Sequence, residues 1–279
     1  MINSIQDRVQ LNNGVQMPWL GLGVWLVRDE VELDNAIKAA IRTGYRAIDT
    51  AAAYYNEEGV GKAIRESDVP REELFITTKV WNVEEDYDTT LKNFEDSRKK
   101  LGLEYIDLYL IHWPGKRRYT ETWRALEALY KQGLVRAIGV SNFEPHHLTR
   151  VLETGSIVPM VNQVEYHPLL TQKELHAFCK KHKIQLQAWS PLMRGRLDLP
   201  LLLELSKKYG KTPAQIVLRW DLQNEVVTIP KSVREHRIAE NAQIFDFELS
   251  QDDMALIDGL NQDERFGADP DVFDFRRGE

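Results

Sequence analysis

The sequence has a single cysteine, Cys179, among its 279 residues, so no internal disulfide can form. One unpaired cysteine fits a protein that works in a reducing compartment. The sequence also lacks an uninterrupted apolar run of the ~18 residues that a membrane-spanning helix requires. Its first residues have neither the basic start nor the apolar centre of a secretory signal. We therefore expect a cytoplasmic protein with no membrane partner.

Basic residues are outnumbered, with 36 Lys and Arg against 43 Asp and Glu and a formal net charge of −7. A nucleic-acid-binding domain would carry a basic patch or stripe, so we expect no nucleic-acid partner. No heptad repeat is evident, and we expect a monomer. The histidines, such as the pair at His146 and His147, show no H-E-x-x-H or comparable ligand spacing. The sequence thus predicts no metal site.

The glycine-rich fingerprints of nucleotide-binding folds are also missing. No G-x-G-x-x-G precedes a helix, and "GLGVW" at 21–25 holds only two glycines. The stretch "EEGVGKAI" lacks the spacing and the Lys-Ser/Thr ending of a phosphate loop. Any nucleotide must therefore be held in a way that differs from the Rossmann fold.

The sequence does contain eight short apolar runs that read as strands. They lack clean alternation, which is typical of parallel strands buried on both faces. Helical segments separate them, with Gly44 ending one and Thr212-Pro213 starting another. Eight such units in ~250 residues predict a single (β/α)₈ TIM barrel domain over residues 1–279, with an open doubly wound sheet as the alternative. The runs are 20–25, 47–51, 75–80, 106–112, 135–141, 159–166, 184–190 and 226–232.

Both ends of the chain carry additions to this pattern. Asn13-Gly14 lies between two strand-like runs and predicts a β-hairpin that plugs the bottom of the barrel. Residues 249–261 predict an extra C-terminal helix, and residues 262–279 an irregular tail.

Four side chains at or just after the ends of adjacent predicted strands suggest chemistry, namely Asp49, Tyr54, Lys79 and His112. A free phenol has a pKa near ~10, and a nearby ammonium lowers it. A carboxylate would keep that ammonium charged, and a histidine could orient a carbonyl oxygen, which together make a tuned general acid. Each residue alone is more simply a paired loop residue or a packed ring. Only the combination indicates catalysis.

Around these residues the sequence resembles the aldo-keto reductase superfamily, particularly bacterial reductases of 2,5-diketogluconate, glyoxal and methylglyoxal. The resemblance covers "GYRAIDTAAAYYNEEGVG", "ITTKVW", "DLYLIHWP", "AIGVSNF", "NQVEYHP", "AWSPL" and "VVTIPKS" in order. It implies a barrel that reduces carbonyl compounds with NADPH. It further implies that Tyr54 donates a proton, that Lys79 lowers its pKa, that Asp49 pairs with Lys79, and that His112 orients the substrate.

The resemblance also assigns cofactor contacts. It implies that the nicotinamide is stacked by Trp189, where many members have tyrosine, and that its carboxamide is bound by Ser141, Asn142 and Gln163. It places Lys231, Ser232 and Arg237 around an adenosine 2′-phosphate and therefore predicts a preference for NADPH. The remaining predicted contacts are Gly23, Val24, Trp25, Ser190, Pro191, Leu192, Glu240 and Asn241.

Two regions differ from the family or extend it. Arg194 and Arg196 stand where relatives often have glutamine, and we consider the hypothesis that both strengthen a pyrophosphate contact. For the substrate we predict a pocket walled by Trp25, Trp81 and Trp113 with His112, suited to small or apolar carbonyl compounds. The short loop around 113–120 predicts an open pocket, and the tail near 266–275 is expected to reach its mouth.

Two other functions are compatible with the same residues. A lysine on a strand near an acid could form a Schiff base, so Lys79 would suit a class I aldolase-type barrel. Alternatively, the chain could be a relative that binds the nucleotide without turnover. The cofactor motifs oppose the first, and the complete set of four polar residues opposes the second.

Overall fold

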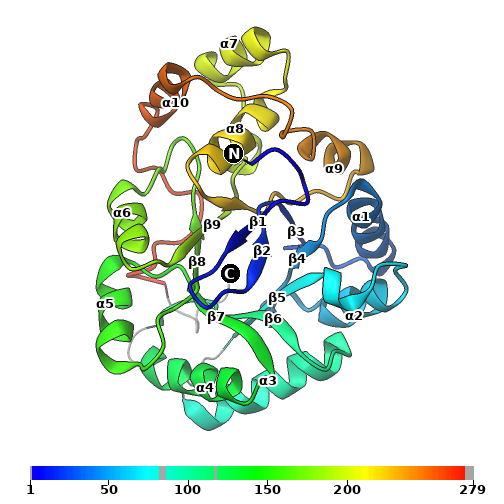
Figure 1. The fold of residues 1–279 in the computed structure, drawn as a ribbon, viewed down its shortest axis with the longest axis vertical. Helices are drawn as coiled ribbons and strands as arrows, with labels where there is room; N and C mark the ends of the chain where they lie inside the picture. Colours follow the sequence, from blue (N-terminus) through cyan, green and yellow to red (C-terminus); the bar gives the residue numbers. More distant parts are fainter. Residues whose placement is uncertain (1, 82–85, 116–117, 274–279) are drawn as a thin grey trace.

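A computed structural model describes residues 2–81, 86–115 and 118–273 of the chain. Eight parallel strands form a nearly closed barrel in sequence order, with the helices outside it (Figure 1). The two ends of the sheet approach each other through parallel bridges from Leu20 to Thr228 and from Gly23 to Lys231. The barrel is therefore confirmed over the open sheet. Its strands are β3 (Gly21–Gly23), β4 (Ala47–Asp49), β5 (Phe75–Val80), β6 (Ile106–Ile111), β7 (Val135–Ser141), β8 (Val161–Glu165), β9 (Gln185–Trp189) and β10 (Val227–Thr228).

Six of the eight predicted runs are longer than the strands that form, and only the runs at 75–80 and 135–141 match β5 and β7. The run at 226–232 contributes only Val227–Thr228, because Pro230 has no N–H for a ladder. The run at 47–51 ends as a strand at Asp49, and the chain then turns into the short helix η1 (Ala52–Tyr54). Because β4 ends at Asp49, Tyr54 lies just beyond the rim of the barrel.

Helices connect the strands, and their ends follow the sequence signals. Gly44 closes α1 in the left-handed region at φ 107°, and Thr212 forms a capping box with Gln215 at the start of α8. The helices are α1 (Glu30–Thr43), α2 (Glu57–Arg65), α3 (Tyr87–Leu101), α4 (Tyr119–Lys131), α5 (Pro145–Thr154), α6 (Lys173–Lys181), α7 (Pro200–Tyr209), α8 (Pro213–Gln223), α9 (Glu235–Asn241) and α10 (Gln251–Asp258), with short helices η2 (Arg71–Glu73) and η3 (Met193–Gly195).

The connection between β9 and β10 contains two helices where simple alternation predicts one. Pro200 begins α7, and Gly210 ends it at φ 64°. Thr212 then starts α8 two residues later. The longer connection places η3 just after the C-terminal end of β9, where the site lies, whereas α7 packs against α8 and α10.

The N-terminal hairpin consists of β1 (Arg8–Gln10) and β2 (Gln16–Pro18), which pair antiparallel as predicted. In its turn, Asn12 donates to the carbonyls of Pro159 and Lys183, which lie just before β8 and β9. Asn13 donates to the carbonyl of Arg136 near the start of β7. The hairpin therefore covers the N-terminal end of the barrel, where Figure 1 shows it within the ring of strands. The C-terminal end is left for a ligand site.

The predicted C-terminal helix is confirmed as α10, which Ser250 caps by accepting from the N–H of Asp253. The segment after α10 returns to the C-terminal end of the barrel strands. There Glu165, the last residue of β8, accepts hydrogen bonds from the backbone N–H groups of Phe266 and Gly267. Across the described ranges, no helix combines the length and apolarity needed to cross a bilayer.

Candidate active site

A cavity of about 1210 Å³ opens at the C-terminal ends of the strands. It is large enough for a dinucleotide together with a small substrate. Of the residues predicted from sequence, Val24, Lys79 and Trp81 do not line it. The predicted residues that do line it are Gly23, Trp25, Asp49, Tyr54, His112, Trp113, Ser141, Asn142, Gln163, Trp189, Ser190, Pro191, Leu192, Lys231, Ser232, Arg237, Glu240 and Asn241.

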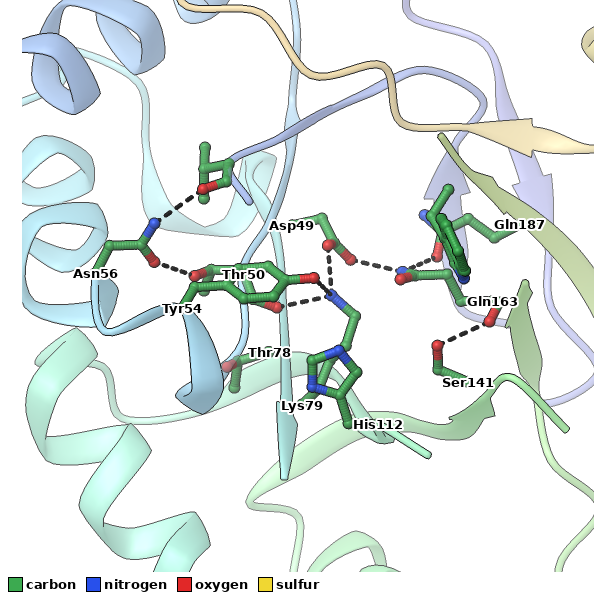
Figure 2. A network of polar contacts seen from close by, with 12 residues as sticks. Asp49, Thr50, Tyr54, Asn56, Thr78, Lys79, His112, Ser141, Gln163 and Gln187 are labelled. Carbon is green, nitrogen blue, oxygen red and sulfur yellow. Dashed lines mark hydrogen bonds and ion pairs between the residues drawn. The ribbon is translucent and has the colours of Figure 1, made fainter. Parts of the chain in front are cut away.

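Lys79 lies beneath the cavity floor, with its side chain fully buried. Its Nζ is 2.5 Å from Asp49 Oδ1, 2.9 Å from the carbonyl oxygen of Thr50 and 3.5 Å from Tyr54 Oη (Figure 2). An ammonium has three N–H donors, so these three acceptors use all of them. The arrangement joins the phenol of Tyr54 to the carboxylate of Asp49 through one buried cation.

Burial alone disfavours both charges of this pair. It raises the pKa of Asp49 and lowers the pKa of Lys79, while the attraction between the two groups opposes each shift. Asp49 Oδ2 also accepts a 2.7 Å hydrogen bond from Gln163 Nε2. Because both partners have further hydrogen bonds, the buried ion pair is fully satisfied.

The loop that carries Tyr54 is fixed by Asn56, which is buried. Asn56 Nδ2 donates to the carbonyls of Val24 and Val27, and its Oδ1 accepts from Thr50 Oγ1 at 2.6 Å. These bonds connect the loop after β3 with the loop after β4 (Figure 2). Asn56 therefore fixes the position of the loop that carries Tyr54 relative to Val24, the residue before Trp25.

His112 stands at the end of β6, against the ring of Tyr54 at a centroid distance of 5.6 Å. Burial, and then the nearby charge of Lys79, lower the pKa of His112 well below its usual range. The imidazole is therefore neutral at pH 7. Among the described residues its buried Nδ1 has no hydrogen-bond partner. A neutral imidazole can donate from one nitrogen to a carbonyl oxygen without adding a charge.

Aromatic rings form the substrate side of the cavity. Trp81 packs edge-on to His112 at 5.3 Å, so it supports the wall from behind. Phe273 of the tail stacks on Trp113 at 4.2 Å and meets Trp81 edge-on at 5.9 Å. The expectation that the tail reaches the mouth is confirmed for its described part, through residues that include Asp269 and Val272. Residues 116–117 and 274–279 lie outside the described ranges.

A cluster of amides and hydroxyls lies opposite Tyr54. Asn142 adopts a left-handed conformation at φ 64°, which asparagine tolerates better than most residues. Its Nδ2 donates to the carbonyl of His112, and its Oδ1 accepts from Trp189 Nε1 at 2.8 Å. Ser141 Oγ donates to the backbone oxygen of Gln163. The polar groups that the sequence predicts for a carboxamide therefore form one connected cluster.

Trp189 is supported from the tail. A Cβ added to Gly267 would lie 2.3 Å from Trp189 Cη2, so the ring packs directly against the bare glycine backbone. Glu165 holds that backbone in place by accepting the N–H groups of Phe266 and Gly267. His167 Nε2 donates to the same carboxylate at 3.0 Å. The glycine makes room for a ring larger than the tyrosine of many relatives.

The far end of the cavity is cationic. Lys231 and Arg237 are exposed there, with the largely buried Ser232 between them in the chain. Within the described part of the chain, neither cation forms an ion pair. Two unpaired cations beside a hydroxyl suit a phosphate group.

Arg194 and Arg196 have different surroundings. Arg194 lines the cavity, and its guanidinium lies 5.6 Å from the ring centroid of Trp25. Arg196 is paired with Glu264 at 2.5 Å and lies over Phe266. Only Arg194 remains in position for a phosphate, so the hypothesis that both arginines make such a contact is not supported by this geometry.

The structure adds site residues that the sequence reasoning missed. Thr50, Asn56, Gly267 and Gln187 act through buried contacts with predicted residues. Asn56 lies inside the motif around Tyr54, but nothing in the sequence distinguishes it from a helix cap. Gln187 had a possible signal, because it is one of two glutamines in the strand run at 184–190.

His146, His147 and Asp271 bring their ligand atoms within 4.8 Å of one another. His147 Nδ1 accepts from the N–H of Glu144, so its neutral ring carries the proton on Nε2, which faces Asp271 at 3.6 Å. At 3.6 Å this contact is too long for a hydrogen bond, and in this tautomer neither ring nitrogen of His147 has a free lone pair for a metal ion. The absence of a metal site stays a prediction.

Comparison with known proteins decides the family. The model of the aldo/keto reductase family matches residues 19–262. The chain belongs to the aldo/keto reductase family. It is 62% identical over 272 residues to the glyoxal reductase of Bacillus subtilis (strain 168), covering 97% of this chain and 99% of that protein. It is 50% identical to the methylglyoxal reductase DkgA of Escherichia coli (strain K12), covering 95% and 97%.

A solved structure extends the likeness to a cofactor complex. The Bombyx mori aldo-keto reductase in complex with NADP superposes with a TM-score of 0.89 at 38% identity, covering 95% of each chain. As an aldo-keto reductase, this chain is an NADP(H)-dependent oxidoreductase that acts on carbonyl groups. The cavity fits that cofactor, because its two ends offer the amide cluster and the unpaired cations described above.

Proposed function

We propose that this aldo-keto reductase reduces small aldehydes and dicarbonyl compounds, such as glyoxal and methylglyoxal, with Tyr54 as the proton donor. The observation that carries the proposal is the position of Lys79 Nζ, which contacts Asp49, the Thr50 carbonyl and the phenol of Tyr54 together. The names of the B. subtilis and E. coli relatives support the choice of dicarbonyl substrates. The uncharged aromatic wall of the cavity is consistent with it.

NADPH, when bound, supplies the hydride that adds to the carbonyl carbon. Tyr54 gives the proton of its Oη to the carbonyl oxygen, so that the carbonyl becomes an alcohol. The ammonium of Lys79 stabilises the phenolate that remains, and Asp49 keeps that ammonium charged and in place. Neutral His112 donates to the same carbonyl oxygen and holds it toward Tyr54. Tyr54 then regains a proton from solvent.

The Schiff-base alternative is poorly supported by the same geometry. An amine that attacks a carbonyl must be neutral and must face the substrate. Lys79 is fully buried, does not line the cavity and is paired with Asp49. A non-catalytic nucleotide-binding role is opposed by the connected Asp49, Lys79 and Tyr54.

Loss of NADPH absorbance in the presence of glyoxal, methylglyoxal and a panel of aromatic aldehydes tests the proposed substrates. We expect the two dicarbonyls to be reduced. If the protein binds NADPH tightly but reduces neither dicarbonyl nor any aromatic aldehyde, the proposed function is wrong, although the fold and the cofactor site are retained.

We expect NADPH to be preferred over NADH, and Arg237 to contribute to that preference. Arg237→Ala removes an exposed cation from the end of the cavity, so we expect NADPH binding to weaken about tenfold, as for a charge-assisted hydrogen bond partly screened by water. NADH binding should not change. Arg234→Ala is the matched control, because Arg234 is an exposed neighbour that does not line the cavity. Equal kcat/KM for the two cofactors in the wild type would contradict the preference.

We also propose that the protein works as a monomer in the cytoplasm. Its only cysteine, Cys179, is buried, and burial raises the pKa of its thiol to about 12, so the group is inert to oxidation. Light scattering on the purified protein tests the monomer, and a dimer at micromolar concentration would contradict it.

A further inference from the structure

Gln187 lies in the middle of β9 and is buried, but it does not line the cavity. Its register partner on the neighbouring strand β8 is Gln163. Partners in a parallel pair of strands point to the same face of the sheet, so both side chains project into the barrel. Gln187 Oε1 accepts a 2.9 Å hydrogen bond from Gln163 Nε2.

The amide of Gln163 has two N–H donors, and the structure uses both. One donates to Asp49 Oδ2 at 2.7 Å, and the other donates to Gln187 Oε1 (Figure 2). A single acceptor would let the amide plane turn about that bond. Two acceptors at different sides of the nitrogen fix the plane. Gln187 is therefore the group that completes the orientation of Gln163.

This orientation leaves one polar atom of Gln163 available. Among the described residues no group donates to Gln163 Oε1, and Gln163 lines the cavity beside Ser141 and Asn142. An amide oxygen whose position is fixed in advance binds a donor with a smaller loss of entropy than a mobile one. The carboxamide of a nicotinamide offers such a donor.

We propose that Gln187 is a positioning residue for the cofactor: it fixes the amide plane of Gln163 so that Oε1 faces the cavity and accepts an N–H from the nicotinamide carboxamide. The same amide donates to Asp49, so the cofactor end of the site is connected to the ion pair that serves Tyr54. This inference rests on the proposed function, since it requires that the wild type binds NADPH.

Binding is measured by calorimetric titration with two ligands, NADPH and 2′-phospho-ADP-ribose, which lacks the nicotinamide. Gln187→Met keeps the length of the side chain and removes the acceptor. One hydrogen bond contributes a net ~0.5–1.5 kcal/mol, so we expect a roughly 2- to 12-fold weaker Kd for NADPH. The Kd for 2′-phospho-ADP-ribose should not change. If Gln187 only supported the fold, Gln187→Met would weaken the binding of both ligands by the same factor.

A double-mutant cycle tests whether Gln187 acts through Gln163. In the Gln163→Met background we expect Gln187→Met to cause no further loss of NADPH affinity, because the group that it orients is gone. Gln185→Met is the matched control: Gln185 lies at the N-terminal end of the same strand, and its amide donates to the carbonyls of Leu186 and Glu225, away from the cavity. Gln185→Met should not change the Kd for either ligand.

Gln187→Glu provides an independent test if the methionine variant does not fold. The glutamate carboxyl group has an acceptor oxygen at the same position along the side chain, so it can still accept from Gln163 Nε2. NADPH affinity should therefore be retained. Equal weakening of both ligands, additive losses in the cycle, or an unchanged NADPH affinity in Gln187→Met would overturn the inference. A wild type that fails to bind NADPH would instead overturn the proposed function.

Discussion

Tyr54→Phe is expected to reduce kcat/KM for methylglyoxal by roughly 10²- to 10⁴-fold, the usual contribution of a positioned general acid. The substitution removes only the hydroxyl that contacts Lys79 Nζ at 3.5 Å. The ring still packs against His112, so the shape of the cavity is preserved. NADPH affinity should therefore be unchanged. Steady-state rates and a binding titration on the same preparation separate the two effects.

Tyr55 supplies the matched control for this variant. It follows Tyr54 directly, but its side chain is 82% exposed and does not line the cavity. Tyr55→Phe should have wild-type rates. If Tyr54→Phe also keeps wild-type rates, another group donates the proton and the assignment of Tyr54 is wrong.

Lys79→Met is expected to lower the free energy of unfolding by about 3–5 kcal/mol, because it leaves the buried carboxylate of Asp49 without its cation. The fully buried side chain of Lys79 is replaced by an apolar one of similar length. Denaturant unfolding followed by circular dichroism measures the change. Adding Asp49→Asn should recover much of the loss, because the unpaired charge is then removed. Lys180→Met is the control, since Lys180 is 71% exposed in its pair with Glu225 and should change stability little.

The sign of the pH dependence follows from Asp49. Without Lys79, burial dominates and raises the pKa of Asp49 further above its unfolded value. The folded variant then binds a proton that the unfolded chain releases, so its stability falls as the pH rises through that window. We expect the deficit of Lys79→Met to be larger at about pH 8 than at about pH 5. A deficit that is independent of pH would show that Asp49 is not the cause.

The barrel and the four central residues could be predicted because their signals are local. A strand buried on both faces is recognisable as a short apolar run, and its end marks the rim of the site. Asp49, Lys79 and His112 all stand at or next to such ends. The motifs around them are long enough to identify the family, and the family supplied the cofactor contacts.

The buried contacts between distant segments could not be predicted. Gln187 is in a strand run, and only the register of β8 against β9 places it beside Gln163. Gly267 lies in an irregular tail, where no periodicity indicates that its backbone packs on Trp189. Val24 was assigned to the cofactor from its motif, but its side chain is buried and does not line the cavity. Its assignment stays a prediction. Such features depend on packing in three dimensions.

The claim that Lys79 makes Tyr54 an effective acid is tested most directly by titrating the phenol itself. The difference in ultraviolet absorbance between the wild type and Tyr54→Phe, followed against pH, isolates the ionisation of this one tyrosine. Because the ammonium of Lys79 stabilises the phenolate, we expect its pKa to lie below the ~10 of a free phenol. A pKa at or above that value would contradict the account.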